Sequence, residues 1–155
     1  MGEEFSVRRI KPEELDELLA LYAQLHPDDD PLPDRAELYL KWADIILNPL
    51  LHYFVGECGG EIVSSCTLAI IPNLTRGARP YGLIENVITR EDCRNRGFGT
   101  AILHYALQIA WDAHCYKVML LSGSKKEETL QFYDGAGFQR GIKTGYIAYP
   151  PGESS

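Results

Sequence analysis

A mixed α/β (α+β) domain is the fold class that this sequence of 155 residues predicts, and three patterns indicate it. Two amphipathic segments come early, a glycine pair separates two β-rich stretches, and a long amphipathic segment lies between two later β-rich stretches. A chain of this length can bury one substantial core, but it is too short for two ordinary domains and a linker. We therefore expect a single domain over residues 1–150 and a disordered tail over residues 151–155.

The N-terminal part of the chain predicts one strand and two helices. Loose alternation of apolar residues predicts a short strand over residues 5–10, and a proline followed by two glutamates is typical of a helix start at Pro12. An acidic, proline-containing stretch ends this first helix. A second helix is expected over residues 33–48, with Trp42 facing the core.

The middle of the chain predicts a hairpin and a further strand. Residues 51–57 and 61–71 are rich in β-formers and flank Gly59-Gly60, a pair that is typical of a tight two-residue turn. A polar loop is expected over residues 72–80, and the next strand is expected over residues 81–89.

The clearest helix is predicted over residues 97–114. A short apolar strand is expected after it, over residues 116–121, with a length that fits a buried central position. The strand before the helix, the helix and this strand would form a crossover unit. The residues expected on the apolar face of the helix are Phe98, Ala101, Ile102, Tyr105, Ile109 and Ala113.

The C-terminal part predicts one more helix and one or two final strands. Ser124 and Glu127 have the spacing of a capping box, and the glycines in residues 135–137 are expected to end the helix. The final strands are expected within residues 138–149.

Charge and hydropathy narrow the class of partner. The formal net charge of −7 argues against binding of nucleic acid or anionic lipid that is mainly electrostatic, and it suits a cationic small substrate. The alternative is that the acidity only keeps the protein in solution. No apolar run is long enough for a membrane span, and the charged start lacks the apolar core of a signal peptide. We therefore expect a soluble, cytoplasmic protein that binds neither nucleic acid nor membranes.

The four cysteines do not predict a metal site. They include no CxxC pair, and no histidine lies at ligand spacing from a cysteine pair, so we expect no bound metal. The thiols are expected to be reduced and mostly buried. Cys93 precedes a basic loop, which leaves a thiol nucleophile at this position as an alternative.

The segment from Arg94 to Thr100 predicts a phosphate-binding loop. It opens an amphipathic helix, where backbone N–H groups without intrahelical partners and the positive end of the helix dipole favour a diphosphate. Gly97 and Gly99 let phosphate oxygens approach the backbone, and Arg94 and Arg96 add cationic donors. The segment matches neither a P-loop nor a dinucleotide-binding fingerprint. The alternative is a flexible helix start with two surface arginines.

In this region the chain resembles the GNAT superfamily of N-acetyltransferases. The cofactor loop of that family has an arginine or glutamine, two residues, a glycine, one residue, and a glycine or alanine, which Arg94, Gly97 and Gly99 match. Residues 1–80 resemble the family only in the order of their predicted elements, which are a strand, two helices and a hairpin. The resemblance extends over residues 81–138 and includes Ile84-Glu85-Asn86-Val87-Ile88, Tyr116-Lys117-Val118, and Phe132-Tyr133 before Gly137-Phe138.

This resemblance implies a GNAT fold with a central mixed, mostly antiparallel sheet, flanked by about four helices and splayed open between the strand ending near Thr89 and the strand starting near Tyr116. Acetyl-CoA is the implied cofactor, with its pantetheine added to the strand edge like a further strand and its pyrophosphate on the loop. The implied cofactor-binding residues are Val87, Ile88, Thr89, Arg94, Asn95, Arg96, Gly97, Phe98, Gly99, Thr100 and Phe132.

Two residues are candidates for catalysis. Attack by a primary amine needs a base, because the ammonium form is not nucleophilic. Glu85 is our candidate, as an acid in an apolar strand where burial would raise its pKa; alternatively it points outward or binds the substrate cation. The resemblance implies that the Tyr133 hydroxyl assists departure of the thiolate, whereas its spacing alone is also typical of a core tyrosine.

The acceptor is expected to be a small-molecule or peptide amine. Residues 84–87 and 114–118 are similar to glucosamine-6-phosphate N-acetyltransferases, which are small homodimers acting on a phosphorylated amino sugar, so a homodimer is implied. Two other functions stay open: a CoA-binding sensor without turnover, and a structural domain without CoA. The sequence assigns no basic cluster to a sugar phosphate, although four cations lie near the expected acceptor end: Lys125, Lys126, Arg140 and Lys143.

Overall fold

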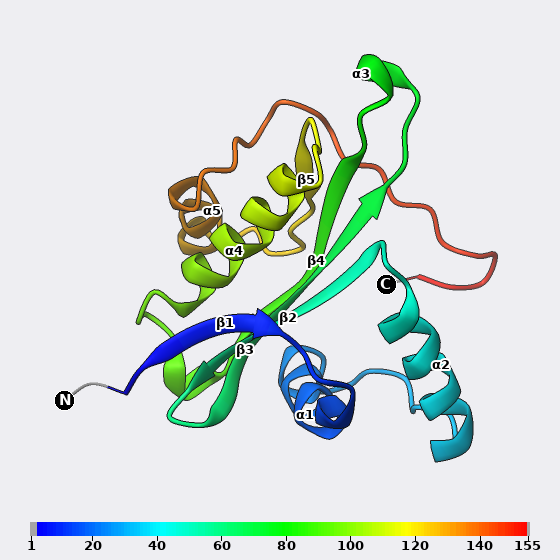
Figure 1. Ribbon diagram of the computed structural model, residues 1–155, viewed down its shortest axis with the longest axis vertical. Helices are drawn as coiled ribbons and strands as arrows, with labels where there is room; N and C mark the ends of the chain where they lie inside the picture. The colour runs from blue at the N-terminus through cyan, green and yellow to red at the C-terminus, as the bar shows by residue number, and fades with distance from the viewer. Residues whose placement is uncertain (1–2, 155) are drawn as a thin grey trace. The chain divides into compact units, whose positions relative to one another are not determined.

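The computed structural model describes residues 3–154. These residues form two compact units, 3–120 and 121–154, which are described separately, and the single domain expected over residues 1–150 stays a prediction. The elements in chain order (Figure 1) are β1 (Phe5–Arg9), η1 (Pro12–Glu14), α1 (Leu15–Leu25), α2 (Arg35–Leu47), β2 (Leu51–Cys58), β3 (Glu61–Ile71), α3 (Thr75–Ala78), β4 (Tyr81–Thr89), η2 (Glu91–Cys93), α4 (Phe98–Asp112), β5 (Val118–Leu120) and α5 (Glu127–Gly135).

The first unit is built on a five-stranded sheet in the order β1-β2-β3-β4-β5. The first four strands pair antiparallel, and β5 joins β4 in parallel. Residues Gly82 to Ile84 of β4 pair with β5; from Glu85 onwards β4 has no partner on this side among the residues that the structure describes. The predicted mixed, mostly antiparallel sheet, splayed open beside β4, is therefore confirmed.

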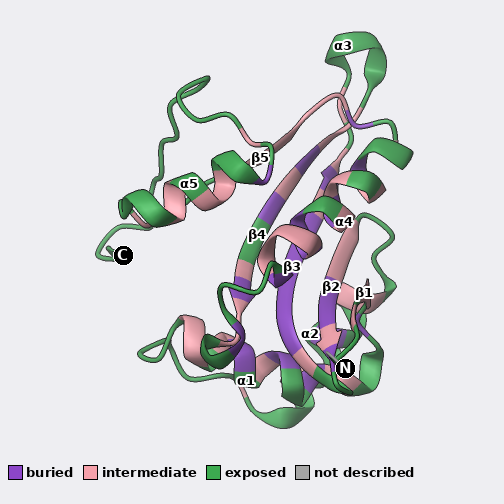
Figure 2. Ribbon diagram, turned by 90° about the vertical axis from the view of Figure 1, so that its left-hand side faces the viewer, coloured by how far each residue is buried: buried purple, intermediate pink, exposed green. Residues whose placement is uncertain are grey.

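Helices pack on both faces of the sheet. Val55 of β2 lies in one core cluster with Leu18 of α1 and Trp42 of α2. Its neighbour Phe54 contacts Tyr105 of α4, with ring centroids 5.1 Å apart. Because successive strand residues point to opposite faces, α1 and α2 cover one face and α4 covers the other. The middle strand β3 is accordingly buried over most of its length (Figure 2).

The hairpin and the second helix are confirmed. Gly59 and Gly60 join β2 to β3 with φ of +59° and +82°, values that glycine adopts without the steric cost of a side chain. The carboxylate of Asp34 caps α2 by accepting a hydrogen bond from the Glu37 amide at 2.9 Å. Trp42 is 6% exposed, and its indole N–H donates to the carbonyl of Pro12 at 2.8 Å, so Trp42 has the predicted core role.

The buried face of α4 differs from the predicted one. Phe98 and Ile102 are buried as expected, but Ala101 and Tyr105 are half-buried. The fully buried face continues instead through Leu103, Ala106 and Ala110, where small side chains let the helix lie close to the sheet.

Two predictions for the second unit were wrong. Residues 138–149 hold no strand, because Arg140 and Gly141 form a turn and the backbone beyond them has no ladder partner within the described residues. The capping box is also absent: α5 begins after Lys126, and the Ser124 hydroxyl accepts from the Lys126 amide at 3.3 Å rather than capping the helix. The expected tail contains a turn, since the amide of Glu153 donates to the carbonyl of Pro150 at 3.0 Å.

Four further features are seen among the described residues. No helix among them has both the length and the hydropathy needed to cross a bilayer. No group of three or more metal-ligating side chains gathers within residues 3–154. All four cysteines are buried and free, as predicted. The polar loop expected over residues 72–80 contains the short α3.

Candidate functional site

The loop from Arg94 to Thr100 places an uncapped helix N-terminus after the end of β4. Gly97 is the N-cap residue of α4 with φ of +82°, a conformation that favours glycine, and no side chain caps the helix. The first intrahelical bond runs from the Ala101 amide to the Gly97 carbonyl at 3.0 Å. The amides of Phe98, Gly99 and Thr100 precede that bond in the first turn, so they are available to an anion.

Two arginines lie beside this helix end, and no carboxylate of the described residues pairs with them. Arg94 and Arg96 are exposed, and neither forms an ion pair within the described part of the chain. The Cζ atom of Arg96 lies 4.7 Å from the centroid of the Phe98 ring, which holds the guanidinium at the first turn of α4. Cationic donors and an uncapped helix dipole therefore meet at one place, as the sequence predicted.

The side chain of Phe98 anchors the loop rather than lining it. Phe98 is buried, and its ring stacks on Phe5 of β1 with centroids 4.1 Å apart and an interplanar angle of 8°. Gly56 provides the space for this pair, since a Cβ atom there would lie 2.7 Å from the Phe5 ring. Of the implied cofactor-binding residues, Phe98 can thus offer its backbone amide but not its side chain.

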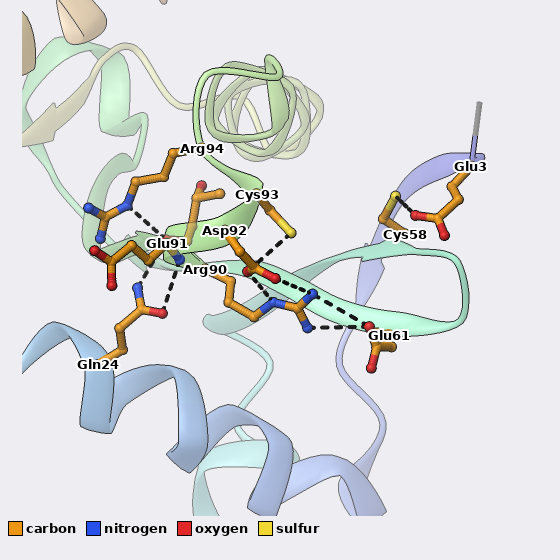
Figure 3. Close-up of polar contacts among 10 residues, drawn as sticks. Glu3, Gln24, Cys58, Glu61, Arg90, Glu91, Asp92, Cys93 and Arg94 are labelled. Carbon is orange, nitrogen blue, oxygen red and sulfur yellow. Dashed lines mark hydrogen bonds and ion pairs between the residues drawn. The ribbon is translucent and has the colours of Figure 1, made fainter.

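Gln24, at the end of α1, contacts the residues that precede the loop (Figure 3). Nothing in the sequence indicated this contact. Its side-chain amide donates to the carbonyl of Thr89 at 3.2 Å, and its oxygen accepts from the Glu91 amide at 3.0 Å. Arg94 Nε donates to the same Thr89 carbonyl at 3.3 Å. The Thr89 carbonyl is therefore already hydrogen-bonded within the protein. We expect the backbone groups of Val87 and Ile88 to be more available than that carbonyl to a ligand at the strand edge.

Arg90 stabilises the start of the loop through two carboxylates. Its guanidinium pairs with Asp92 at 2.6 Å and with Glu61 at 3.4 Å (Figure 3). The hydrogen bond from Arg90 lowers the pKa of Asp92. Cys93 is buried beside them and its Sγ lies 3.5 Å from Asp92 Oδ1, which suits a packed thiol.

A β-bulge in β4 lies directly after Glu85. Thr67 of β3 pairs with Glu85 and Ser65 pairs with Ile88, so β4 has one residue more than β3 in this interval. Asn86 has φ of +53°, and it is exposed next to the exposed Glu85, where regular alternation would bury it. The expectation that Glu85 is buried in an apolar strand was therefore wrong: Gly82 and Ile84 form the buried phase of β4, and Glu85 lies on the outward phase, as the alternative had it.

Polar side chains lie beneath this bulge. Tyr22 of α1 is largely buried, and burial raises its pKa to about 12, while the nearby Thr67 and Asn86 side chains act in the opposite direction. The Tyr22 hydroxyl therefore stays protonated at neutral pH. The hydroxyls of Ser65 and Thr67 are buried without a hydrogen-bond partner of good geometry among the described residues. The side chains next to the bulge thus include the hydroxyl groups of Tyr22, Ser65 and Thr67.

The second unit carries the remaining predicted residues. Phe132 and Tyr133 lie on α5, both half-buried, with ring centroids 4.9 Å apart. The Tyr133 ring also meets Phe138 edge-on at 6.4 Å, and the Phe138 amide donates to the Tyr133 carbonyl at 3.1 Å. Arg140 pairs with Glu127 and Asp134, both at 3.1 Å, so it is already neutralised within its own unit.

Comparison with known proteins gives a consistent result. The family model described as "Acetyltransferase (GNAT) family" matches residues 15–138. Glucosamine 6-phosphate N-acetyltransferase of Trypanosoma brucei brucei is 40% identical over 86 residues, which cover 56% of this chain and 56% of that protein. For the first curated relatives the match spans between 42% and 61% of their length.

Solved structures resemble the chain over nearly its whole length. A putative acetyltransferase from Agrobacterium tumefaciens str. C58 is 41% identical, with a TM-score of 0.87 and coverage of 94% of this chain and 99% of that chain. The aminoglycoside N-acetyltransferase AAC(6')-Iy, solved in complex with CoA, is 17% identical with a TM-score of 0.76, covering 97% of this chain and 95% of that chain. At that identity the likeness concerns the fold alone.

Proposed function

The chain belongs to the acetyltransferase (GNAT) family, and on this premise we propose that it transfers the acetyl group of acetyl-CoA to a primary amine. One observation supports the proposal most directly. The uncapped first turn of α4 and the unpaired guanidinium groups of Arg94 and Arg96 lie together at the end of β4. This set of donors suits a pyrophosphate, because it combines backbone N–H groups, the helix dipole and two fixed cations.

The open edge of β4 suits the rest of the cofactor. Val87 and Ile88 lie beyond the last residue of β4 that pairs with β5, so their backbone groups on that side can take up an extended chain with amide groups. Bound there, acetyl-CoA supplies an activated acetyl thioester. The cofactor-binding residues of the proposal are those named from the sequence, with Phe98 contributing its amide.

Glu85 is the proposed general base. Its carboxylate lies at the bulge of β4, at the point where the strand edge becomes free, and its exposure lets a substrate amine or a water molecule reach it. As the amine nitrogen bonds to the acetyl carbon and the carbon–sulfur bond breaks, Glu85 takes the proton that the amine loses, directly or through water.

Tyr133 is the proposed donor to the departing thiolate, a role that rests on the resemblance of Phe132-Tyr133 and Gly137-Phe138 to the family pattern. We expect Tyr133→Phe to lower kcat about tenfold to a hundredfold while acetyl-CoA affinity stays the same, because the hydroxyl acts when negative charge develops on sulfur. Steady-state kinetics and calorimetry measure the two quantities. Wild-type kcat in this variant would refute the role.

A phosphorylated amino sugar is the second candidate acceptor. The relative from Trypanosoma brucei brucei, 40% identical over 86 residues, is by name a glucosamine 6-phosphate N-acetyltransferase, which supports this narrower function. The proposal also includes a cytoplasmic location and a homodimer; size-exclusion chromatography with light scattering tests the homodimer, and a monomer at all concentrations would refute it.

The function is tested by titrating the purified protein with acetyl-CoA in a calorimeter and then measuring thiol release with a panel of primary amines. We expect saturable binding and amine-dependent release of CoA. Binding without release with any amine would favour a CoA-binding sensor instead. Absence of binding would refute the proposal as a whole.

A further inference from the structure

A group of basic and aromatic side chains lies where β4 and β5 begin, and we call it the basic cluster: Arg76, Arg79, Tyr81, Tyr116 and Lys117. The Cζ atoms of Arg76 and Arg79 lie 5.9 Å and 5.7 Å from the centroid of the Tyr116 ring. Lys117 Nζ lies 5.2 Å from that ring and 5.3 Å from the Tyr81 ring. Three cations therefore surround two tyrosine rings at one end of β4, and the cofactor loop follows the other end.

The backbone holds this cluster in place. The Asn73 side chain donates to the carbonyl of Arg79 at 3.1 Å, and Arg79 Nε donates to the carbonyl of Arg76 at 2.9 Å. The Tyr116 amide donates to the carbonyl of Pro80 at 3.0 Å, which fixes the start of β5 beside the start of β4. The cations are thus brought together by the fold itself and need no ligand to assemble.

The loop also adopts an unfavourable conformation. Arg76 and Ala78 have φ of +58° and +59°, in the left-handed region that residues with a side chain rarely occupy. Such conformations persist where the surrounding structure enforces them, and they are concentrated at binding and active sites. Here the conformation accompanies the placement of Arg76 over the Tyr116 ring.

Among the residues that the structure describes, no carboxylate neutralises the basic cluster. Within residues 3–154, none of its three cations forms an ion pair, although the chain as a whole carries a net charge of −7. Like charges held close together repel one another, and an anion placed among them relieves that repulsion. Four other arginines do pair with carboxylates: Arg8, Arg35, Arg90 and Arg140.

We propose that the basic cluster binds the dianionic phosphate monoester of the acceptor substrate. Two guanidinium groups and one ammonium group match the charge and the several acceptor oxygens of a phosphate better than those of a single carboxylate. The hydroxyls of Tyr81 and Tyr116 add two neutral donors. The inference rests on the proposed function, because it assigns the amine of the acceptor to Glu85 and the phosphate of the same molecule to the basic cluster.

The arrangement along β4 supports an acceptor phosphate rather than a phosphate of the cofactor. The proposed pyrophosphate site follows Thr89, at the far end of the strand, whereas Tyr81 begins it. Glu85 lies between them, four residues from Tyr81, which is on the order of 13 Å along a strand. Long Arg and Lys side chains shorten that span, so a small phosphorylated amine can reach Glu85 while its phosphate stays in the basic cluster.

Binding is measured first, by calorimetry without turnover, with glucosamine 6-phosphate, glucosamine and inorganic phosphate as probes. We expect glucosamine 6-phosphate to bind the wild-type protein about tenfold to a hundredfold more tightly than glucosamine, and the double variant Arg79→Gln/Lys117→Gln to lose this difference. The matched control Arg35→Gln/Lys41→Gln removes two exposed cations of α2 and should keep the difference. Equal binding of the two probes to the wild-type protein would overturn the proposal.

Folding of the double variant is checked by its acetyl-CoA affinity, which should not change because the cofactor loop follows the opposite end of β4. If that variant does not fold, the single change Arg76→Gln in the exposed loop serves instead, with an expected loss of about tenfold. Wild-type affinity for glucosamine 6-phosphate in a folded variant would also overturn the proposal.

A kinetic comparison identifies the source of the phosphate. If the phosphate belongs to the acceptor, glucose 6-phosphate inhibits competitively against glucosamine 6-phosphate, and the double variant raises KM for that acceptor with little change in kcat. Non-competitive inhibition would show a separate phosphate ligand and overturn the assignment. Acetylation of unphosphorylated amines at unchanged rates by the same variant would leave the proposed function intact, so the two proposals can fail independently.

Discussion

Gly99→Trp is expected to raise the dissociation constant for acetyl-CoA by on the order of a hundredfold or more. Gly99 lies in the first turn of α4, between the amides of Phe98 and Thr100 that we assign to the pyrophosphate. An indole at this position covers those amides, and loss of two or more hydrogen bonds to a charged group costs about 1.5–3 kcal/mol each. Calorimetric titration with acetyl-CoA measures the change directly.

The variant should keep its fold, because tryptophan is a better helix former than glycine and Gly99 is only half-buried. Ala43→Trp is the matched control: it places the same side chain on an exposed position of α2 and should bind acetyl-CoA as the wild type does. Unchanged affinity in Gly99→Trp, with circular dichroism like that of the wild type, would show that the pyrophosphate does not sit on this helix end.

The parts of the site that sequence could predict are those built from adjacent residues. The loop from Arg94 to Thr100 contains its own turn glycine, its own cations and the start of its own helix, so local chemistry was enough to predict this geometry. The hairpin at Gly59-Gly60 was predictable for the same reason, since the turn and both flanking strands are contiguous. In both cases the pattern of residues and the structure it forms lie in one short segment.

The parts that sequence missed depend on residues that the fold brings together. Gln24 reaches Thr89 and Glu91 across 65 and 67 residues of chain, and nothing in its own segment marks it. The basic cluster joins the loop before β4 to Lys117 through the parallel pairing of β4 and β5. Neither contact follows from spacing along the chain, because each needs the register of the sheet.

The burial of Glu85 was predicted from the apolar composition of its segment, and composition does not tell which face of the strand a residue takes. The apolar residues around Glu85 favoured burial, but Gly82 and Ile84 take the buried phase of β4, so Glu85 lies on the outward phase. The bulge that follows exposes Asn86 as well. Asn86 was a usable signal, because asparagine tolerates positive φ better than most residues and is unfavourable in a regular strand. The prediction of final strands over residues 138–149 was wrong for another reason. Residues with high β-propensity do not form a strand when their backbone has no partner strand.

Glu85→Gln is expected to lower kcat by about a hundredfold to ten-thousandfold, the range over which a positioned general base contributes. The substitution keeps the size and the hydrogen-bonding reach of the side chain and removes its ability to accept the proton of the attacking amine. Since Glu85 is exposed, we expect little change in the free energy of unfolding and none in acetyl-CoA affinity. Steady-state kinetics with the best amine of the panel, over a range of pH, measures the effect.

The pH profile distinguishes the base from a residue that merely binds the substrate. Without a base the reaction depends on amine that is already neutral, so the rate of Glu85→Gln should rise about tenfold per pH unit below the pKa of the amine and approach the wild-type rate at high pH. Glu91→Gln, which removes an exposed carboxylate of the adjacent η2, is the control for charge and should show neither effect. A raised KM with unchanged kcat in Glu85→Gln would instead assign Glu85 to binding of the substrate cation, because an interaction equally strong in the ground state and the transition state changes KM alone.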